Sequence, residues 1–402
     1  MMNKALIIIL FSVTLDAIGI GLIFPILPSL LRELTGAGDI SMLYGLILAG
    51  YALMLFIFAP LLGTLSDRFG RRPILMIAMG GAAIDYLVMT FAPNVEILII
   101  GRLIAGMTAA SMAVATAYIA DISKVEDRAK RFGFFGACFG IGFIIGPALG
   151  GVLGEIWIRA PFLAAAILNA INLLLAIFLL PESRKGKKQK LEIIKLNPFS
   201  PIIWAYKQDS IRSLLFVFLA FTFIGSIYGT IWVLFTQDKF AWSVAMVGLS
   251  LTAYGLFQAL AQAVLSGPAA SWLGEKGAVL AGLSCEIVAL IIVAFIGQGW
   301  LIFLLVPLFA LGDIGGPALQ SLLSSKVGED MQGQLQGVLT SLASLMAIIG
   351  PIFFASLYAS FRADWPGAIW LVAVVLYIIM LPLIIFGGSA WDKITPDFEE
   401  NQ

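Results

Sequence analysis

The chain has 402 residues, of which 60% are hydrophobic and 12% are charged, and its mean hydropathy is +1.01. About a quarter of the residues of a soluble globular protein are charged, so this composition excludes a soluble globule and indicates that lipid is the main solvent of the chain. Lysine plus arginine and aspartate plus glutamate balance at 24 each, which argues against nucleic-acid binding, and no large soluble domain is left to act as a conventional enzyme.

Apolar runs of roughly 20 residues, the length that crosses about 30 Å of hydrocarbon as a helix, recur along the whole chain. The first run has no small-residue cleavage site after it, so we expect a retained helix and not a signal peptide. The sequence therefore predicts an all-α membrane protein. Its twelve transmembrane helices are expected near residues 5–27, 43–65, 73–93, 96–120, 132–154, 160–180, 211–236, 245–266, 277–297, 299–325, 335–358 and 366–388.

The positions of the basic residues indicate the orientation of these helices. If the N-terminus is cytoplasmic, most lysines and arginines fall in cytoplasmic segments, and only Arg32, Arg159, Lys239 and Arg362 fall on the other face. The positive-inside rule then places both termini in the cytoplasm. We expect a multi-pass protein of the inner (cytoplasmic) membrane.

Four carboxylates lie inside the apolar runs: Asp16, Asp85, Glu286 and Asp313. An ionised carboxylate is costly at the bilayer centre, so such residues usually face a cavity or a partner. Burial disfavours the charged form, which lets an acid load a proton from one side and release it to the other. Because the chain has no histidine, proton coupling would depend on these four carboxylates. The alternative for each is a permanently protonated acid that donates to a neighbouring helix.

Arg102, in GRLIAG, lies inside the fourth run. A buried guanidinium stays charged and needs an anion or carbonyl partner, and Asp16 and Asp85 are the candidates. We expect a proton-coupling role in which protonation of the acid releases the ion pair. The alternative is a side chain that snorkels toward the outer leaflet.

A charged motif, GTLSDRFGRR at 63–72, connects the second and third runs. Its glycines allow a tight turn where two helices approach closely, and its charges can pair with those that follow the fourth run. Such a network would latch the outward-open state, whereas ordinary positive-inside anchoring is the alternative. The residues assigned to this gate are Gly63, Asp67, Arg68, Gly70, Arg71, Arg72, Asp121 and Arg128.

The fifth run contains GIGFIIGPALGG, residues 140–151. The spacing of its glycines places several of them on one helix face, which permits close backbone packing, and the proline removes one helical hydrogen bond and bends the segment. The sequence predicts a hinge here, although packing alone explains most of the pattern. The hinge residues are Gly142, Gly146, Pro147, Gly150 and Gly151.

The longest polar stretch divides the chain into an N-terminal six-helix bundle at 1–180, a cytoplasmic linker at 181–210 and a C-terminal six-helix bundle with a short tail at 211–402. The halves repeat. GPAASWLGEK at 267–276 keeps the glycines at the first and eighth positions and the basic residue at the tenth position of the motif at 63–72. Parallel six-helix repeats around a central site are a transporter plan in which the halves rock.

These motifs resemble those of the major facilitator superfamily. GTLSDRFGRR is similar to its signature between helices 2 and 3, and GIGFIIGPALGG to the helix 5 motif of its proton-driven drug exporters. LDAIGIGLIFPILPSLLREL, IFAPLLGTLSDRFGRRP, GRLIAG, IWVLFT and PALQ extend the resemblance to the tetracycline/proton antiporter branch over nearly the whole chain. The resemblance implies essential acids at Asp16, Asp85 and Glu286, whereas those relatives carry a small residue at the position of Asp313.

A central drug pocket needs aromatic walls and a few polar groups that fix orientation. The residues assigned to it are Phe24, Ser226, Tyr228, Trp232, Phe235, Phe257 and Gln258; an aromatic on a membrane helix can instead face lipid or the core. The resemblance implies glutamine at Leu55 and Ser226 and histidine at Gln258 in tetracycline pumps. The pocket of this chain is therefore more apolar and lacks an imidazole, which puts transport of a metal–tetracycline chelate in doubt.

Together these features predict proton-coupled efflux of an amphipathic drug, with tetracycline or a related compound as the first candidate, by alternating access. The expected partners are the drug, protons and the bilayer; we expect no cofactor beyond the coupling proton, no metal, and function as a monomer. The alternatives are a proton-coupled exporter of other drugs, an uptake carrier for a sugar or organic acid, which the helix 5 motif disfavours, and a non-transporting membrane sensor or scaffold.

Overall fold

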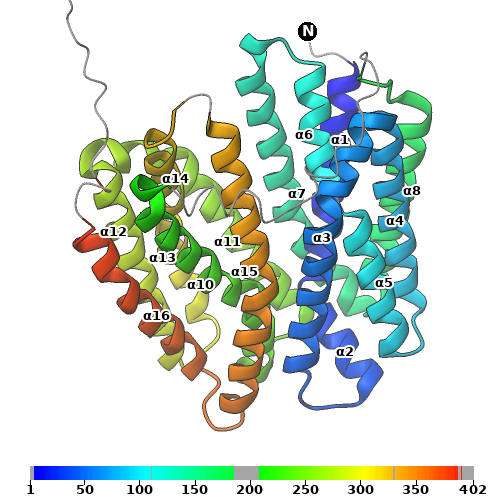
Figure 1. Cartoon of the computed structure of the whole chain (residues 1–402). Coiled ribbons are helices and arrows are strands. Elements are labelled where there is room, and N and C mark those ends of the chain that lie inside the picture. The colour runs from blue at the N-terminus through cyan, green and yellow to red at the C-terminus, as the bar shows by residue number, and fades with distance from the viewer. Residues whose placement is uncertain (1–3, 110, 185–207, 329–330, 388–390, 392–402) are drawn as a thin grey trace, which may run out of the picture. The chain divides into compact units, whose positions relative to one another are not determined.

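A computed structural model describes residues 4–109, 111–184, 208–328, 331–387 and 391, and within these residues the regular structure is helical (Figure 1). In this described part of the chain, twelve helical segments are long and apolar enough to cross a membrane, as predicted. The helices are α1 (Lys4–Ile23), α2 (Leu27–Thr35), α3 (Ser41–Phe69), α4 (Arg71–Phe91), α5 (Val95–Thr108), α6 (Ser111–Asp121), α7 (Arg128–Ile156), α8 (Ala160–Leu179), α10 (Asp209–Phe240), α11 (Val244–Val264), α12 (Ser266–Phe295), α13 (Leu301–Gly312), α14 (Gly315–Ser325), α15 (Gln332–Phe361) and α16 (Ala368–Ile385).

The predicted first run was too long. Helix α1 ends at Ile23, and the short helix α2, which was not predicted, begins at Leu27 with a proline in its first turn. Proline has no backbone N–H, so Pro25 and Pro28 interrupt the hydrogen bonding of one helix and suit the start of the next. The fourth and tenth runs are also interrupted, because each consists of two helices, α5 with α6 and α13 with α14.

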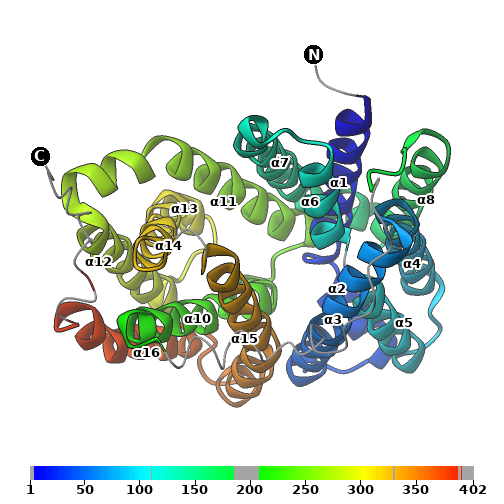
Figure 2. The same cartoon turned by 45° about the horizontal axis from the view of Figure 1, so that its top comes forward.

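Contacts divide the described chain into two compact units. The first contains described residues of Met1–Pro198, Ile227–Leu256 and Ala347–Pro366, and the second contains those of Phe199–Ser226, Phe257–Met346 and Gly367–Gln402. Within the first unit α1 packs against α7 and α8, and α3 against α5 (Figure 1). Within the second, α12 packs against α13, α14 and α16 (Figure 2). This division differs from the predicted halves, whose boundaries at 180 and 211 stay a prediction because residues 185–207 lie outside the described part.

The glycines of α7 pack closely against α1. Three of them follow at four-residue spacing, Gly142, Gly146 and Gly150, and a Cβ built on any of them would collide with the α1 backbone; at Gly146 it would lie 2.8 Å from an α1 Cα. Gly151 faces the backbone of α11 at Ala245 instead. Helix α7 continues through Pro147. Three of the four glycines therefore form the predicted close-packed helix face, whereas the hinge role stays a prediction.

The predicted repeat has a conformational counterpart. Gly70, between α3 and α4, has φ 108°, and Gly274, at a kink inside α12, has φ 69°; these are the eighth residues of the two motifs. Positive φ strongly favours glycine over residues with a Cβ. The tight turn predicted for the motif thus lies at its eighth position. Gly63 lies inside α3, where a Cβ would meet no atom within 4 Å, and its gating role stays a prediction.

The tenth residues of the two motifs also behave alike. Arg72 donates from Nη2 to the carbonyl oxygen of Ile177, near the end of α8. Lys276 donates from Nζ to the carbonyl oxygen of Ile385, the last residue of α16, at 3.0 Å. Basic side chains near a helix C-terminus satisfy its last carbonyl groups, so each repeat uses its basic residue to cap the final helix of its own half.

Candidate functional site

The first unit contains a buried ion pair between neighbouring helices. Arg102 of α5 donates from Nε to Oδ1 of Asp85 of α4 at 3.2 Å, and its Nη2 contacts Oδ2 of the same carboxylate. Asp85 is 2% and Arg102 is 8% exposed. Of the two candidate partners, the structure therefore pairs Arg102 with Asp85, and the alternative of a snorkelling arginine does not fit a side chain so deeply buried.

Asp16, on α1, belongs to the same group of polar side chains as this ion pair. Its carboxylate accepts a hydrogen bond from the Ser111 hydroxyl of α6. The Arg102 guanidinium carbon lies 5.3 Å from the centre of the Tyr51 ring, a cation–π distance, and Tyr51 is also within electrostatic reach of Asp16. We call Asp16, Tyr51, Asp85, Arg102 and Ser111 the N-terminal polar cluster. The charged members of the cluster were predicted from the sequence, whereas Tyr51 and Ser111 were not, because these residue types carry no signal of their own in a membrane helix.

A second group of polar side chains lies in the second unit. Its members are Gln258 of α11, Glu286 of α12 and Asp313 between α13 and α14. Gln258 of α11 donates from Nε2 to Oδ2 of Asp313 at 2.8 Å. Asp313 lies at the break between α13 and α14. Glu286 of α12 is 8% exposed, and a Cβ built on Gly312 would collide with its carboxylate. Two predicted proton-coupling acids and one predicted drug-contact residue therefore converge here.

The charged motif at 63–72 forms the predicted kind of network. Arg71 lies 2.8 Å from Asp67 and 3.1 Å from Asp121, and its Nη1 donates to the Ser66 hydroxyl at 2.6 Å. These contacts join the ends of α3, α4 and α6. Arg128 is exposed, and among the residues whose side chains are described no ion pair joins it to Asp67 or Asp121; its gating role stays a prediction.

The network includes two members that the sequence analysis missed. The Glu182 carboxylate accepts hydrogen bonds from the backbone N–H groups of Arg71 at 2.9 Å and Arg72 at 3.2 Å, which begin α4. Arg184 pairs with Asp67. Glu182 and Arg184 both follow α8, far along the chain from this turn, so only the fold brings them to it.

Arg68, which was also assigned to the gate, is exposed, and its guanidinium carbon lies 5.3 Å from the centre of the Phe69 ring.

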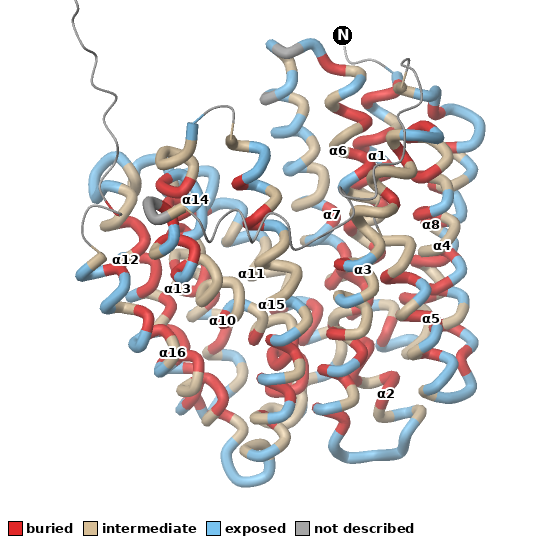
Figure 3. The backbone as a smooth tube through the Cα atoms, viewed as in Figure 1, coloured by how far each residue is buried: buried red, intermediate tan, exposed pale blue. Residues whose placement is uncertain are grey.

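Another charged cluster lies at the opposite ends of the helices, where Arg32, Asp39, Asp238 and Arg362 meet; we call it the outer-face cluster, after the orientation that the positive-inside rule predicts. Asp238 lies 2.7 Å from Arg32 and 3.0 Å from Arg362, and Arg362 lies 3.3 Å from Asp39. The α2–α3 connection that carries Asp39 is mostly exposed (Figure 3). The cluster ties this connection to the ends of α10 and α15 within the first unit.

Two groups in the outer-face cluster have shifted pKa values. Burial opposes ionisation of Asp39, but hydrogen bonds from the amide and hydroxyl of Ser41, together with the charge of Arg362, outweigh it, so the pKa of Asp39 lies below its ordinary value. The hydrogen bond to Asp238 raises the pKa of Arg362 above its ordinary value. Both shifts favour the charged forms that make the ion pairs.

The residues predicted to line a drug pocket have different environments. Phe235 is fully buried and Trp232 is 7% exposed, with the indole Nε1 donating to the Ser250 hydroxyl at 3.0 Å. These two side chains belong to the packed interior, and we do not carry them into the proposed site. The hydroxyl of Ser226 donates to a carbonyl of its own helix. The remaining four, Phe24, Tyr228, Phe257 and Gln258, are half-buried or exposed.

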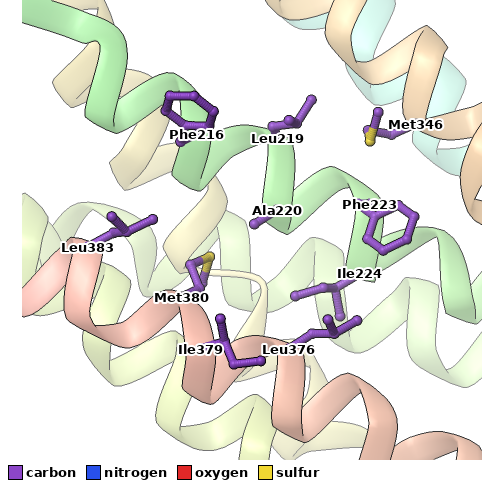
Figure 4. Close-up of a pocket in the computed structure, with 10 residues that line it drawn as sticks. All are labelled: Phe216, Leu219, Ala220, Phe223, Ile224, Met346, Leu376, Ile379, Met380 and Leu383. Atoms are coloured by element: carbon purple, nitrogen blue, oxygen red, sulfur yellow. The ribbon is translucent and has the colours of Figure 1, made fainter.

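An apolar pocket of about 310 Å³ lies in the second unit between α10 and α16, with Met346 at one edge (Figure 4). Its lining consists of leucine, isoleucine, phenylalanine, methionine and alanine side chains. None of the predicted drug-contact residues lines it. Because a drug site needs a few polar groups to orient its ligand, this pocket does not fit that role.

Comparison with known proteins bears on the whole chain. A family model described as Major Facilitator Superfamily matches residues 9–230 and 213–400. The class C tetracycline resistance protein of Escherichia coli is 48% identical over 98% of this chain and 99% of that protein. The class B protein of Escherichia coli is 41% identical over 95% of each chain. The quinolone resistance protein NorA of Staphylococcus aureus is 29% identical over 89% of this chain and 90% of that protein.

Solved structures share the fold at lower identity. A crystal structure of the nucleoside transporter NupG covers 96% of this chain and 99% of that one, with a TM-score of 0.78 and 14% identity. The human organic anion transporter MFSD10 gives a TM-score of 0.69 at 23% identity. Together with the family match, the twelve segments of the described residues that are long and apolar enough to cross a membrane indicate a multi-pass membrane transporter.

Proposed function

Because this chain belongs to the major facilitator superfamily, we propose that it exports tetracycline or a related drug across the inner membrane in exchange for protons, by alternating access. The observation that carries the proposal is the buried ion pair between Asp85 and Arg102 inside a bundle of membrane-spanning helices. The names of the relatives that are 41–48% identical support the choice of drug. We further propose cytoplasmic termini and function as a monomer.

The N-terminal polar cluster suits proton coupling because of its charge balance. A buried ion pair repays part of its desolvation cost through mutual attraction, and it is strongly destabilised when one charge is removed. A proton that reaches Asp85 neutralises the carboxylate and releases Arg102 to another anion. Asp16 is linked to the same arginine through Tyr51, so Arg102 can exchange one carboxylate partner for another as protons arrive.

The charged groups at the two ends of the first unit could act as two gates that open in turn. The network around Arg71 joins helix ends on the side of α1 that carries the N-terminus, and the outer-face cluster joins the opposite ends. In alternating access, ion pairs on one face form while those on the other release. The side chains proposed to contact the drug are Phe24 and Tyr228 in the first unit and, separately, Phe257 and Gln258 in the second.

Everted membrane vesicles with an acidic interior test the proposal. We expect tetracycline to accumulate in vesicles that carry the protein and this accumulation to collapse when a protonophore is added. Equal accumulation in vesicles with and without the protein would reject tetracycline export, and uptake of ethidium instead would favour an exporter of other drugs.

Variants then separate coupling acids from structural ones. Asp16→Asn, Asp85→Asn and Glu286→Gln should each lose proton-driven accumulation while the protein still inserts. Glu96→Gln is a matched control, because Glu96 is an exposed acid in the first turn of α5, and it should transport normally. Normal transport in all three acid variants would show that these carboxylates are structural.

A further inference from the structure

Two asparagines of α8 are fully buried in the first unit, where α8 packs against α1. Asn172 donates from Nδ2 to the carbonyl oxygen of Ser12, on α1, at 3.4 Å. Asn169 donates to the carbonyl oxygen of Ala165 in its own helix at 3.0 Å, and its Nδ2 would lie 3.2 Å from a Cβ built on Gly19 of α1. The two amides therefore meet α1 at two points that are seven residues apart.

Asp16 lies between these two points. Residues 12, 16 and 19 follow at the spacing that places side chains on one face of a helix, so Asp16 belongs to the α1 face that the asparagines contact. Tyr86 of α4 also reaches this face. Its hydroxyl would lie 2.8 Å from a Cβ built on Gly19, and it is within electrostatic reach of Asp16.

Three buried polar atoms at this interface have no hydrogen-bond partner among the described residues, namely the Ser12 hydroxyl and the Oδ1 atoms of Asn169 and Asn172. A buried polar group without a partner costs free energy, and a buried water molecule typically bonds to about three such groups. The amide oxygens only accept, whereas the hydroxyl can donate. One water that donates to both oxygens and accepts from Ser12 satisfies all three, and it keeps one lone pair for a further donor.

We propose that these three atoms hold one internal water molecule, which accepts the hydrogen bond of Asp16 when that carboxyl is protonated. An ionised Asp16 can only accept, and Ser111 of α6 supplies a donor. A protonated carboxyl has an O–H that needs an acceptor. Asn169 and Asn172 are thus positioning residues that act through the water. This inference rests on the proposed function, because it takes Asp16 to bind a coupling proton.

A buried apolar cluster closes this site toward the N-terminal end of α1. It includes Ile9 and Val13 of α1 and Ala176, which lies one turn beyond Asn172 on α8. An apolar barrier offers no hydrogen-bond partners that could carry a proton onward. The water therefore holds the proton on Asp16 and does not conduct it to the nearer membrane surface.

The ionisable groups close to Asp16 come from α3, α4 and α5. They are Tyr51, Asp85, Tyr86 and Arg102, and both tyrosines are within electrostatic reach of Asp16. Helix α8 carries no ionisable side chain, and α7 faces this part of α1 with Gly142 and Gly146. The other ionisable side chains of α6 and α7 are Tyr118, Asp121, Arg128, Lys130, Arg131, Cys138 and Glu155.

The pH at which Asp16 takes up its proton tests the proposal. Infrared difference spectra of the purified full-length protein report this pH through the carboxyl C=O band that Asp16→Asn removes. Asn169→Val and Asn172→Val should each lower the midpoint by about one pH unit, a tenfold weaker binding of the proton, because the protonated form loses one hydrogen bond. Ser12→Ala should shift it in the same direction.

Threonine has the shape of valine and keeps a hydroxyl that accepts a hydrogen bond. Asn169→Thr and Asn172→Thr should therefore keep the midpoint close to that of the unmodified protein. Thr340→Val is the matched control for the loss of a hydroxyl, since Thr340 is exposed on α15, and it should leave the midpoint unchanged. If a valine variant fails to insert, Ser12→Ala carries the test.

The outcomes separate this inference from the proposed function. Equal midpoints in the valine and threonine variants would overturn the positioning role, even if the unmodified protein exports tetracycline. A shift in the valine variants alone, in a protein that shows no proton-driven uptake of tetracycline in vesicles, would reject only the proposed function. Absence of any carboxyl band that Asp16→Asn removes would overturn both.

Discussion

Arg102 and Asp85 form a two-point ion pair between α5 and α4, in which Nε lies 3.2 Å from Oδ1 and both side chains are almost fully removed from the protein surface. The pair has no net charge, so the free-energy cost of burying it among membrane helices stays low only while both partners are present. This dependence makes it a sensitive point for protons and for mutation.

Removing only the arginine should be worse than removing both charges. Arg102→Leu leaves the Asp85 carboxylate buried without a cation, which costs about 3–5 kcal/mol of stability. The double variant Asp85→Asn, Arg102→Leu should recover much of that stability but not transport. Thermal unfolding of the purified proteins in detergent measures the first effect and vesicle uptake the second; equal melting temperatures for the single and double variants would contradict this account.

The close contact of α7 with α1 should be sensitive to one added methyl group. Gly146→Ala places a Cβ 2.8 Å from the α1 backbone, so the helices must separate, at a cost of about 1–3 kcal/mol. Gly140→Ala is the matched control, because a Cβ there meets no atom within 4 Å. We expect a lower melting temperature and slower transport for Gly146→Ala alone. Equal behaviour of both variants would show that the glycine stripe is not a tight interface.

The two repeat glycines should differ in their tolerance of alanine. Both have positive φ, so alanine at either position costs roughly 1–2 kcal/mol. At Gly70 the added Cβ also displaces the Glu182 carboxylate from the backbone N–H groups that begin α4, whereas at Gly274 it meets no atom within 4 Å. Gly70→Ala should therefore lower the melting temperature more than Gly274→Ala. The reverse order would mean that Glu182 contributes little to this turn.

The outer-face cluster should make stability depend on pH. The pKa of Asp39 is lower in the folded protein than its ordinary value, so Asp39 contributes stability above the ordinary carboxyl pKa, and that contribution is lost as the pH falls through the lowered value. The melting temperature of the unmodified protein should exceed that of Asp39→Asn at pH 7 and approach it in strong acid.

The matched control for this pH dependence is Asp364→Asn, since Asp364 is an exposed acid beyond the end of α15. It should leave the difference between neutral and acid melting temperatures unchanged. A gap between the unmodified protein and Asp39→Asn that persisted below the lowered pKa would show that the contribution of Asp39 does not depend on its charge.

The sequence by itself determined the membrane class, the twelve spans, the repeat and the intramembrane acids. These properties follow from local composition, because roughly 20 consecutive apolar residues suffice to span hydrocarbon and a lone acid among them is conspicuous wherever it points. The glycines at 70 and 274 were also visible as equivalent positions, and the backbone gives both the positive φ that favours glycine.

Tertiary structure alone decided which groups meet. Sequence left Arg102 with two candidate acids. It gave no sign that Glu182 and Arg184 join the network around Arg71 or that Gln258 and Asp313 touch. Ion pairs and hydrogen bonds form over about 3 Å between atoms, and these partners, which are 17 to 117 positions apart in the chain, reach that distance only through helix packing. Spacing along the chain therefore fixed the chemistry available in the membrane, whereas packing chose the partners.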